Sequence, residues 1–179
     1  MKIFIINGSS ALFRKNKNKI DEVVKKELGP AHDYEVFSPF WPGVIRRTIR
    51  SIKKTKGPIV LIGKSLGGVR VWWLLKKYED YIHDRDVKVL LIDPHGAQPG
   101  DEEACIYGRY ADDCLEGPHY VINKGFCVYQ RCDWPKGAKW NGGTRGGTWF
   151  IENYRIMNTD HYKIINDPET LRLISEVVK

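Results

Sequence analysis

The sequence predicts an α/β protein, a three-layer α/β/α sandwich with a mostly parallel central sheet. Apolar runs typical of strands alternate with helix-like segments over the first two thirds of the chain. The run VKVLLID is almost continuously apolar, as expected where helices cover both faces of a parallel sheet. With 179 residues, of which 42% are hydrophobic, the chain suits a single domain over residues 1–179 with a substantial core.

The first half of the chain alternates regularly between the two kinds of element. The run KIFIING predicts a buried strand that ends in an Asn-Gly turn, and an amphipathic helix is expected from Lys17 to Leu28. DYEVFSPF predicts the second strand. A basic helix follows from about Val44 to Thr55, and IVLIG predicts the third strand.

The second half is less regular. A helix is expected from Leu66 to about Tyr81, and its strongly apolar first turns predict that it packs in the middle of the domain. VKVLLID predicts the fourth strand, and residues 94–118 predict a loop. YVINKGFCVYQ predicts the fifth strand, while GGTRGGTWFIENYRIM predicts a turn and the sixth. A last helix starts at Asp167-Pro168-Glu169, because proline suits a first helical turn.

Much of the net charge of +7 lies in the predicted basic helix. Apolar or small residues recur there at helical spacing, so the cations share the opposite face. Such a face is either simply solvated or used to contact an anionic surface, and we expect no specific binding of nucleic acid. The cations are Arg46, Arg47, Arg50, Lys53, Lys54 and Lys56.

Cysteine use and segment hydropathy bear on the compartment. The four cysteines are either free thiols in a reducing compartment or form one or two disulfides, and both interpretations remain open. No C-x-x-C pair is present, and we expect neither a metal nor a cofactor. Neither a signal peptide nor a transmembrane segment is recognisable. The default expectation is a cytoplasmic protein, although export without a recognisable signal would leave the same pattern. The cysteines are Cys105, Cys114, Cys127 and Cys132.

Two motifs overlap in IVLIGKSLGGVRVWWLL, from Ile59 to Leu75. GKS is the end of a phosphate-binding P-loop, but the first glycine of that motif is replaced by Pro58, and the residues between favour a strand. The sequence therefore excludes a P-loop. G-x-S-x-G fits a nucleophile elbow instead, in which Ser65 lies on a sharp strand-to-helix turn between Gly63 and Gly67.

Through IGKSLGG the chain resembles the α/β-hydrolase superfamily, particularly its small lidless cutinase-like lipases and esterases. The order of elements extends the likeness over most of the chain. Compared with the full fold, we expect this chain to lack the first strands and to have no cap domain. The resemblance implies a minimal α/β-hydrolase fold and a catalytic triad in the chain order Ser, Asp or Glu, His.

The resemblance assigns candidate residues to that triad. Ser65 would be the nucleophile. His161 would be the base, because among the five histidines only His161 follows the last predicted strand and precedes the last helix. Two acids remain open. Asp93 ends the fourth strand in LLIDPHG and is preferred, and Asp133 follows the fifth strand in YQRCDWP.

The resemblance also implies an oxyanion hole made of two backbone N–H groups. One belongs to Leu66, directly after the nucleophile. The other is expected from the loop NGSS after the first strand, most simply from Ser9.

These residues predict a serine hydrolase that cleaves an ester or thioester through an acyl-enzyme. The absence of a cap predicts an open site for a small-molecule, lipid or polymeric ester. The alternative is a non-catalytic, hydrolase-like binding module whose basic helix contacts an anionic partner.

Overall fold

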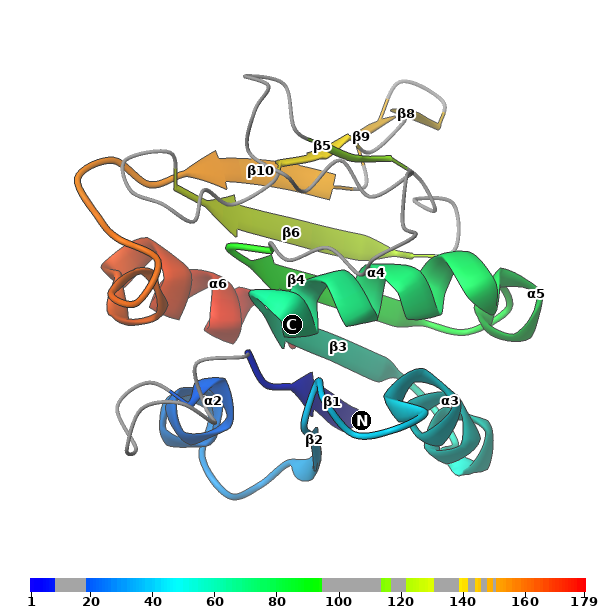
Figure 1. Cartoon of the computed structure of the whole chain (residues 1–179). Helices are drawn as coiled ribbons and strands as arrows, with labels where there is room; N and C mark the ends of the chain where they lie inside the picture. Colours follow the sequence, from blue (N-terminus) through cyan, green and yellow to red (C-terminus); the bar gives the residue numbers. More distant parts are fainter. Residues whose placement is uncertain are drawn as a thin grey trace.

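The computed structural model describes residues 1–8, 19–94, 122–130 and 151–179, and the backbone of short strands at 114–116, 139–141, 144–145 and 148–149. Its centre is a six-stranded sheet in the order β10-β6-β4-β3-β1-β2 (Figure 1). Every neighbouring pair in this sheet is parallel. The six strands are β1 Lys2–Ile6, β2 Asp33–Phe37, β3 Ile59–Lys64, β4 Val87–Ile92, β6 Lys124–Tyr129 and β10 Ile151–Arg155.

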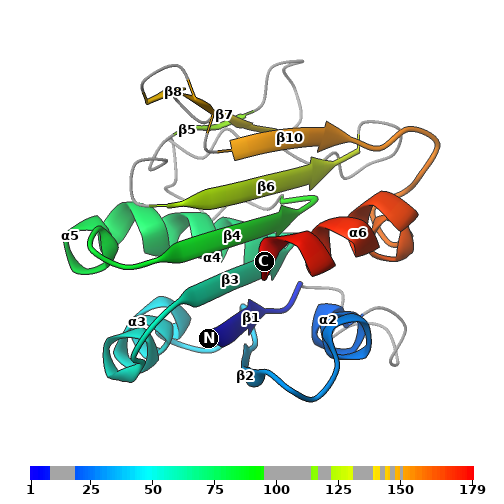
Figure 2. The ribbon, with the colours of Figure 1, turned by 180° about the vertical axis from the view of Figure 1, so that it is seen from behind.

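Helices cover both faces of the sheet, so the predicted α/β class with a mostly parallel sheet is confirmed. In Figure 1 α4 crosses in front of the sheet, and Figure 2 shows α6 on the opposite face. The core accordingly has two parts, one shared with α3, α4 and α5 and the other with α2 and α6. The helices are α2 Ile20–Leu28, α3 Val44–Lys54, α4 Leu66–Lys77, α5 Glu79–Ile82 and α6 Pro168–Val177, with a 3-10 turn at Ile164–Asn166.

The central strand β3 shows why its sequence is apolar throughout. Ile59 and Leu61 belong to the α3–α4 side of the core, while Val60 and Ile62 belong to the α2–α6 side. Alternate residues of a strand point to opposite faces, and here both faces are buried.

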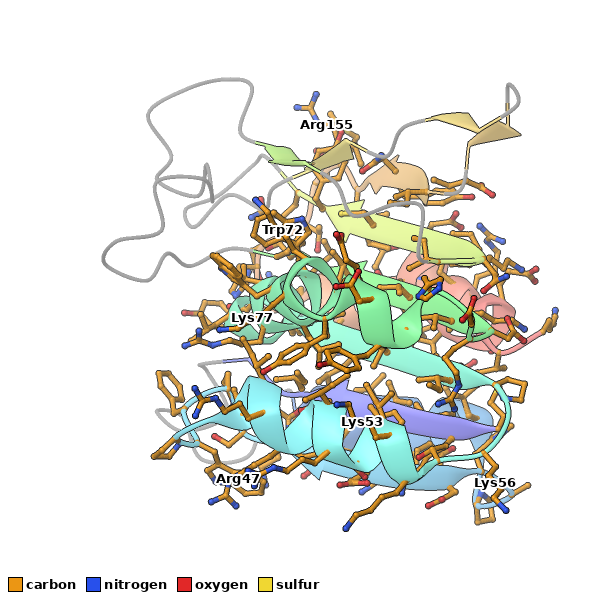
Figure 3. The ribbon with its side chains drawn as sticks, turned by 90° about the vertical axis from the view of Figure 1, so that its right-hand side faces the viewer. Arg47, Lys53, Lys56, Trp72, Lys77 and Arg155 are labelled. Atoms are coloured by element: carbon orange, nitrogen blue, oxygen red, sulfur yellow. The ribbon has the colours of Figure 1, made fainter. Side chains whose placement is uncertain are left out.

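The basic helix α3 has the expected two-sided character. Val44, Thr48, Ile49 and Ile52 are buried against the sheet. All six cations of the segment are exposed, and Figure 3 shows Arg47 and Lys53 on α3 with Lys56 just beyond it.

Several elements differ from the sequence-based expectation. The helix expected from Leu66 to Tyr81 is divided at Tyr78, whose φ of −125° is not helical. The second strand ends at Phe37 instead of continuing through FSPF, because Pro39 has no N–H to donate to a strand ladder. The expected loop over 94–118 contains a short strand, β5, at Cys114–Glu116.

The short strands form two small sheets. β5 (Cys114–Glu116) pairs in parallel with β7 (Lys139–Asn141). β8 (Thr144–Arg145) pairs antiparallel with β9 (Thr148–Trp149).

The connections place a switch point in the strand order between β1 and β3. After β1 the chain passes through α2 to the edge strand β2, then returns through α3 to β3 on the other side of β1. The segments that leave β1 and β3 therefore separate to opposite faces, towards α2 and α4. In parallel α/β sheets ligands bind beyond the carboxyl ends of the strands at this kind of switch point.

Candidate active site

Ser65 lies directly at this switch point, between the end of β3 and the start of α4. Its backbone has φ 55° and ψ −127°, a region that residues other than glycine rarely occupy. The Ser65 N–H donates to the carbonyl of Ile92 at 2.9 Å, and the Ser65 carbonyl accepts from Gly68 at 2.9 Å. The strained turn is therefore fixed on one side by β4 and on the other by α4.

The two glycines that flank Ser65 allow close packing of backbone on backbone. A Cβ atom on Gly63 would lie 2.5 Å from the Gly67 carbonyl oxygen, and one on Gly67 would lie 2.0 Å from the Ile6 carbonyl oxygen. Both distances are far below a normal contact, so larger residues would displace α4 from β1 and β3. This packing is the physical reason for glycine at both positions.

Asp93 and His161 meet at the end of β4, the strand next to the one that leads into Ser65. Asp93 follows β4, the neighbour of β3, and has a positive φ of 44°. Its Oδ2 lies 2.5 Å from Nδ1 of His161, 68 residues further along the chain, and both side chains are buried. A carboxylate only accepts hydrogen bonds, so the proton of this bond belongs to Nδ1. The other ring nitrogen, Nε2, is then the basic one.

Gln130 lies at the end of β6, the strand that pairs with β4, and holds the Asp93 carboxylate in place. Gln130 follows β6, and its backbone N–H donates to Oδ1 of Asp93 at 3.0 Å. Its side-chain amide donates to Oδ2 at 3.3 Å. Sequence reasoning missed Gln130, because nothing in YQRCDWP distinguishes a residue that supports the acid from the acid itself.

A tight turn after β10 presents His161. Oδ1 of Asp160 accepts from the backbone N–H groups of Tyr162 at 2.8 Å and Lys163 at 2.7 Å. Burial raises the pKa of Asp160, but these hydrogen bonds hold it below its ordinary value. The Asp160 side chain thus orders the turn, and buried Ile164 and Ile165 anchor the chain that follows.

Lys64, the residue before Ser65, is fully buried. Within the described part of the chain its Nζ has no hydrogen-bond partner, and it lies 6.0 Å from the centre of the Tyr162 ring. Burial lowers the pKa of Lys64 to about 8, against the opposing attraction of Asp93 and Asp160. The sequence motifs GKS and IGKSLGG contain Lys64, but neither predicts its burial.

The loop after β1 also reaches Ser65. A Cβ atom on Gly8 would lie 3.2 Å from Cβ of Ser65, so the two segments are in contact. The Asn7 side chain donates to Oδ1 of Asp21 at 2.9 Å, which ties the loop to the first turn of α2. Leu66 is the first residue of α4, where backbone N–H groups have no acceptor within the helix. Ser9 lies outside the described residues.

The structure therefore brings Ser65, Asp93 and His161 to the carboxyl ends of neighbouring strands, and Leu66 follows Ser65 as the first residue of α4. The alternative acid Asp133 lies outside the described residues, and the carboxylate that contacts the imidazole is that of Asp93. Among the residues with described surroundings, no group of three His, Cys, Asp or Glu side chains is placed to hold a metal ion.

Fold and site together define an α/β protein with a buried Asp–His pair next to a strained serine turn at the switch point of a parallel sheet. No model of a known protein family matches the sequence, and no curated protein matches it either. None of the described helices has the length and apolar character that crossing a lipid bilayer requires.

Proposed function

We propose that the protein is a serine hydrolase of the α/β-hydrolase type, which cleaves an ester or thioester through an acyl-enzyme. The observation that carries the proposal is the buried contact between Asp93 and Nδ1 of His161, one strand away from the strained turn at Ser65. A serine hydroxyl is a weak nucleophile until an oriented base takes its proton. The Asp93–His161 pair is such a base in the appropriate tautomer.

The proposed reaction has two steps. Nε2 of His161 accepts the Ser65 hydroxyl proton while Oγ attacks the substrate carbonyl carbon, and the resulting imidazolium returns the proton to the departing alcohol or thiol. A water molecule then attacks the acyl carbon and gives a proton to Nε2. The bond from that carbon to Oγ breaks, and the imidazolium returns the proton to Oγ, so the Ser65 hydroxyl is regenerated and the carboxylic acid leaves. The backbone N–H of Leu66 would stabilise the oxyanion, with a second donor from the loop that begins at Asn7 and Gly8.

The proposed substrate is a small-molecule, lipid or polymeric ester. A second candidate is a non-catalytic module whose six exposed cations on and just after α3 contact an anionic partner. Covalent reaction at Ser65 distinguishes the hydrolase from the binding module, because binding alone does not require an activated serine.

A fluorophosphonate probe followed by peptide mass spectrometry tests the proposal. We expect a single adduct on Ser65, and Ser65→Ala should reduce both labelling and hydrolysis of p-nitrophenyl esters at least about a thousandfold. Ser175→Ala, a change at a partly exposed serine on α6, should leave both unchanged. Folded wild-type protein that takes up no probe, or labelling that survives in Ser65→Ala, would contradict the proposal.

A further inference from the structure

A stiff loop between β2 and α3 exposes two aromatic side chains. Phe40 and Trp41 are 44% and 47% exposed, unusually high for rings of this size. Pro39 and Pro42 flank them and restrict the backbone. The Trp41 N–H donates to the Ser38 carbonyl at 3.2 Å, and the Trp41 carbonyl accepts from the N–H of Val44, the first residue of α3, at 3.0 Å.

The Trp41 ring is also held in place by Phe37, the last residue of β2. It packs edge-on against the buried ring of Phe37, with 6.2 Å between the ring centres. The exposed aromatic surface is therefore held in a defined position, which lowers the entropy lost when a ligand binds.

The two rings form one side of a groove of about 520 Å³. The first turn of α3, Arg70 and Lys77 of α4, and Tyr78 directly after α4 complete it. This volume is in the range of small-molecule sites. A flat membrane surface or a long polymer would not need such a concave shape.

The described lining of the groove carries three cations. Arg46 enters from α3, while Arg70 and Lys77 enter from α4, where they are two turns apart on one face. None of the described residues that line the groove is acidic. Figure 3 shows Lys77 on α4 and Arg47 on the neighbouring helix α3.

We infer that this groove binds a small molecule in which an aromatic ring is joined to an anionic group, such as an aryl phosphate. The aromatic part stacks on Trp41 or Phe40, and the anion is bound by the guanidinium group of Arg46 and the ammonium group of Lys77. The inference does not depend on Ser65 and stands or falls separately from the proposed hydrolase activity.

The experiment is a calorimetric titration with 1-naphthyl phosphate at physiological ionic strength. The key variant is Arg46→Ala/Lys77→Ala, which removes two exposed cations from the groove. The matched control is Arg47→Ala/Arg50→Ala, which removes two exposed cations from α3 that do not line the groove. Both variants change the net charge equally, so general attraction of anions affects them alike.

We expect the groove variant to weaken binding at least tenfold and the control variant less than twofold. Trp41→Ala should also weaken binding several-fold, while inorganic phosphate and 1-naphthol should each bind much more weakly than the joined molecule. Equal losses in the two double variants, or no binding at millimolar ligand, would overturn the inference. So would binding to anionic phospholipid vesicles without binding to naphthyl phosphate, which would identify the surface as a membrane contact.

Discussion

Two oppositely charged side chains are buried at the ends of neighbouring strands, and the structure satisfies them very differently. At the end of β4, the Asp93 carboxylate receives hydrogen bonds from the backbone and side chain of Gln130 and contacts His161. At the end of β3, the Lys64 ammonium has no hydrogen-bond partner in the part of the chain that the structure describes. Both side chains are 0% exposed.

This difference separates two kinds of burial. A buried charge with good hydrogen bonds is rigidly placed, whereas one without them lowers stability. The fully supported group is the one whose orientation the proposed chemistry requires. The unsupported one lies directly before Ser65, at a turn that is itself strained. The sheet edge therefore combines a precise Asp–His pair with a locally unfavourable β3 end, as is often found where function opposes stability.

The largest effect is expected on activity, when the contact between Asp93 and His161 is altered. Asp93→Asn replaces the acceptor at Nδ1 by an amide and favours the wrong imidazole tautomer, so kcat/KM for a p-nitrophenyl ester should fall by about 10⁴. The control is Asp86→Asn, an exposed change just before β4, which should leave kcat/KM unaltered. If Asp93→Asn keeps more than a tenth of the activity, Asp93 does not orient the base.

The next largest effect is expected on stability, when the buried charge of Lys64 is removed. Lys64→Met keeps the length of the side chain and removes the buried charge, so the free energy of unfolding at pH 7 should rise by about 3 kcal/mol. Urea denaturation measures this. The comparison variant is Lys124→Met on β6, where the ammonium is paired with Glu176 at 2.7 Å and half-exposed. That variant should lose up to about 1 kcal/mol. A Lys64→Met protein less stable than wild type would mean that the ammonium is favourably bound after all.

The same contrast shows what the sequence could predict. The strands and helices could be predicted from the spacing of apolar residues and from the Gly and Pro residues that end each element, because these signals lie within the segment itself. The contact between Asp93 and His161 was accessible because the ends of parallel strands share one edge, although the catalytic role of the pair remains a prediction. The support of Asp93 by Gln130 depends on how two strand ends meet in space. The burial of Lys64 depends on which segments cover the end of β3 in the folded protein. Neither the support of Asp93 nor the burial of Lys64 can therefore be predicted from a local sequence pattern.

The smallest effect, and the most specific to Lys64, is a pH dependence of stability. Burial lowers the pKa of Lys64 to about 8 in the folded protein, while the unfolded chain has the ordinary value of 10.5. Between these values the unfolded state binds more protons, so the free energy of unfolding rises with pH. The difference between wild type and Lys64→Met isolates this contribution from other titrating groups. It should shift in favour of wild type by up to about 1.4 kcal/mol per pH unit between pH 8 and pH 10. A difference that stays constant over that range would show that Lys64 keeps its ordinary pKa and therefore an environment rich in water or carboxylates.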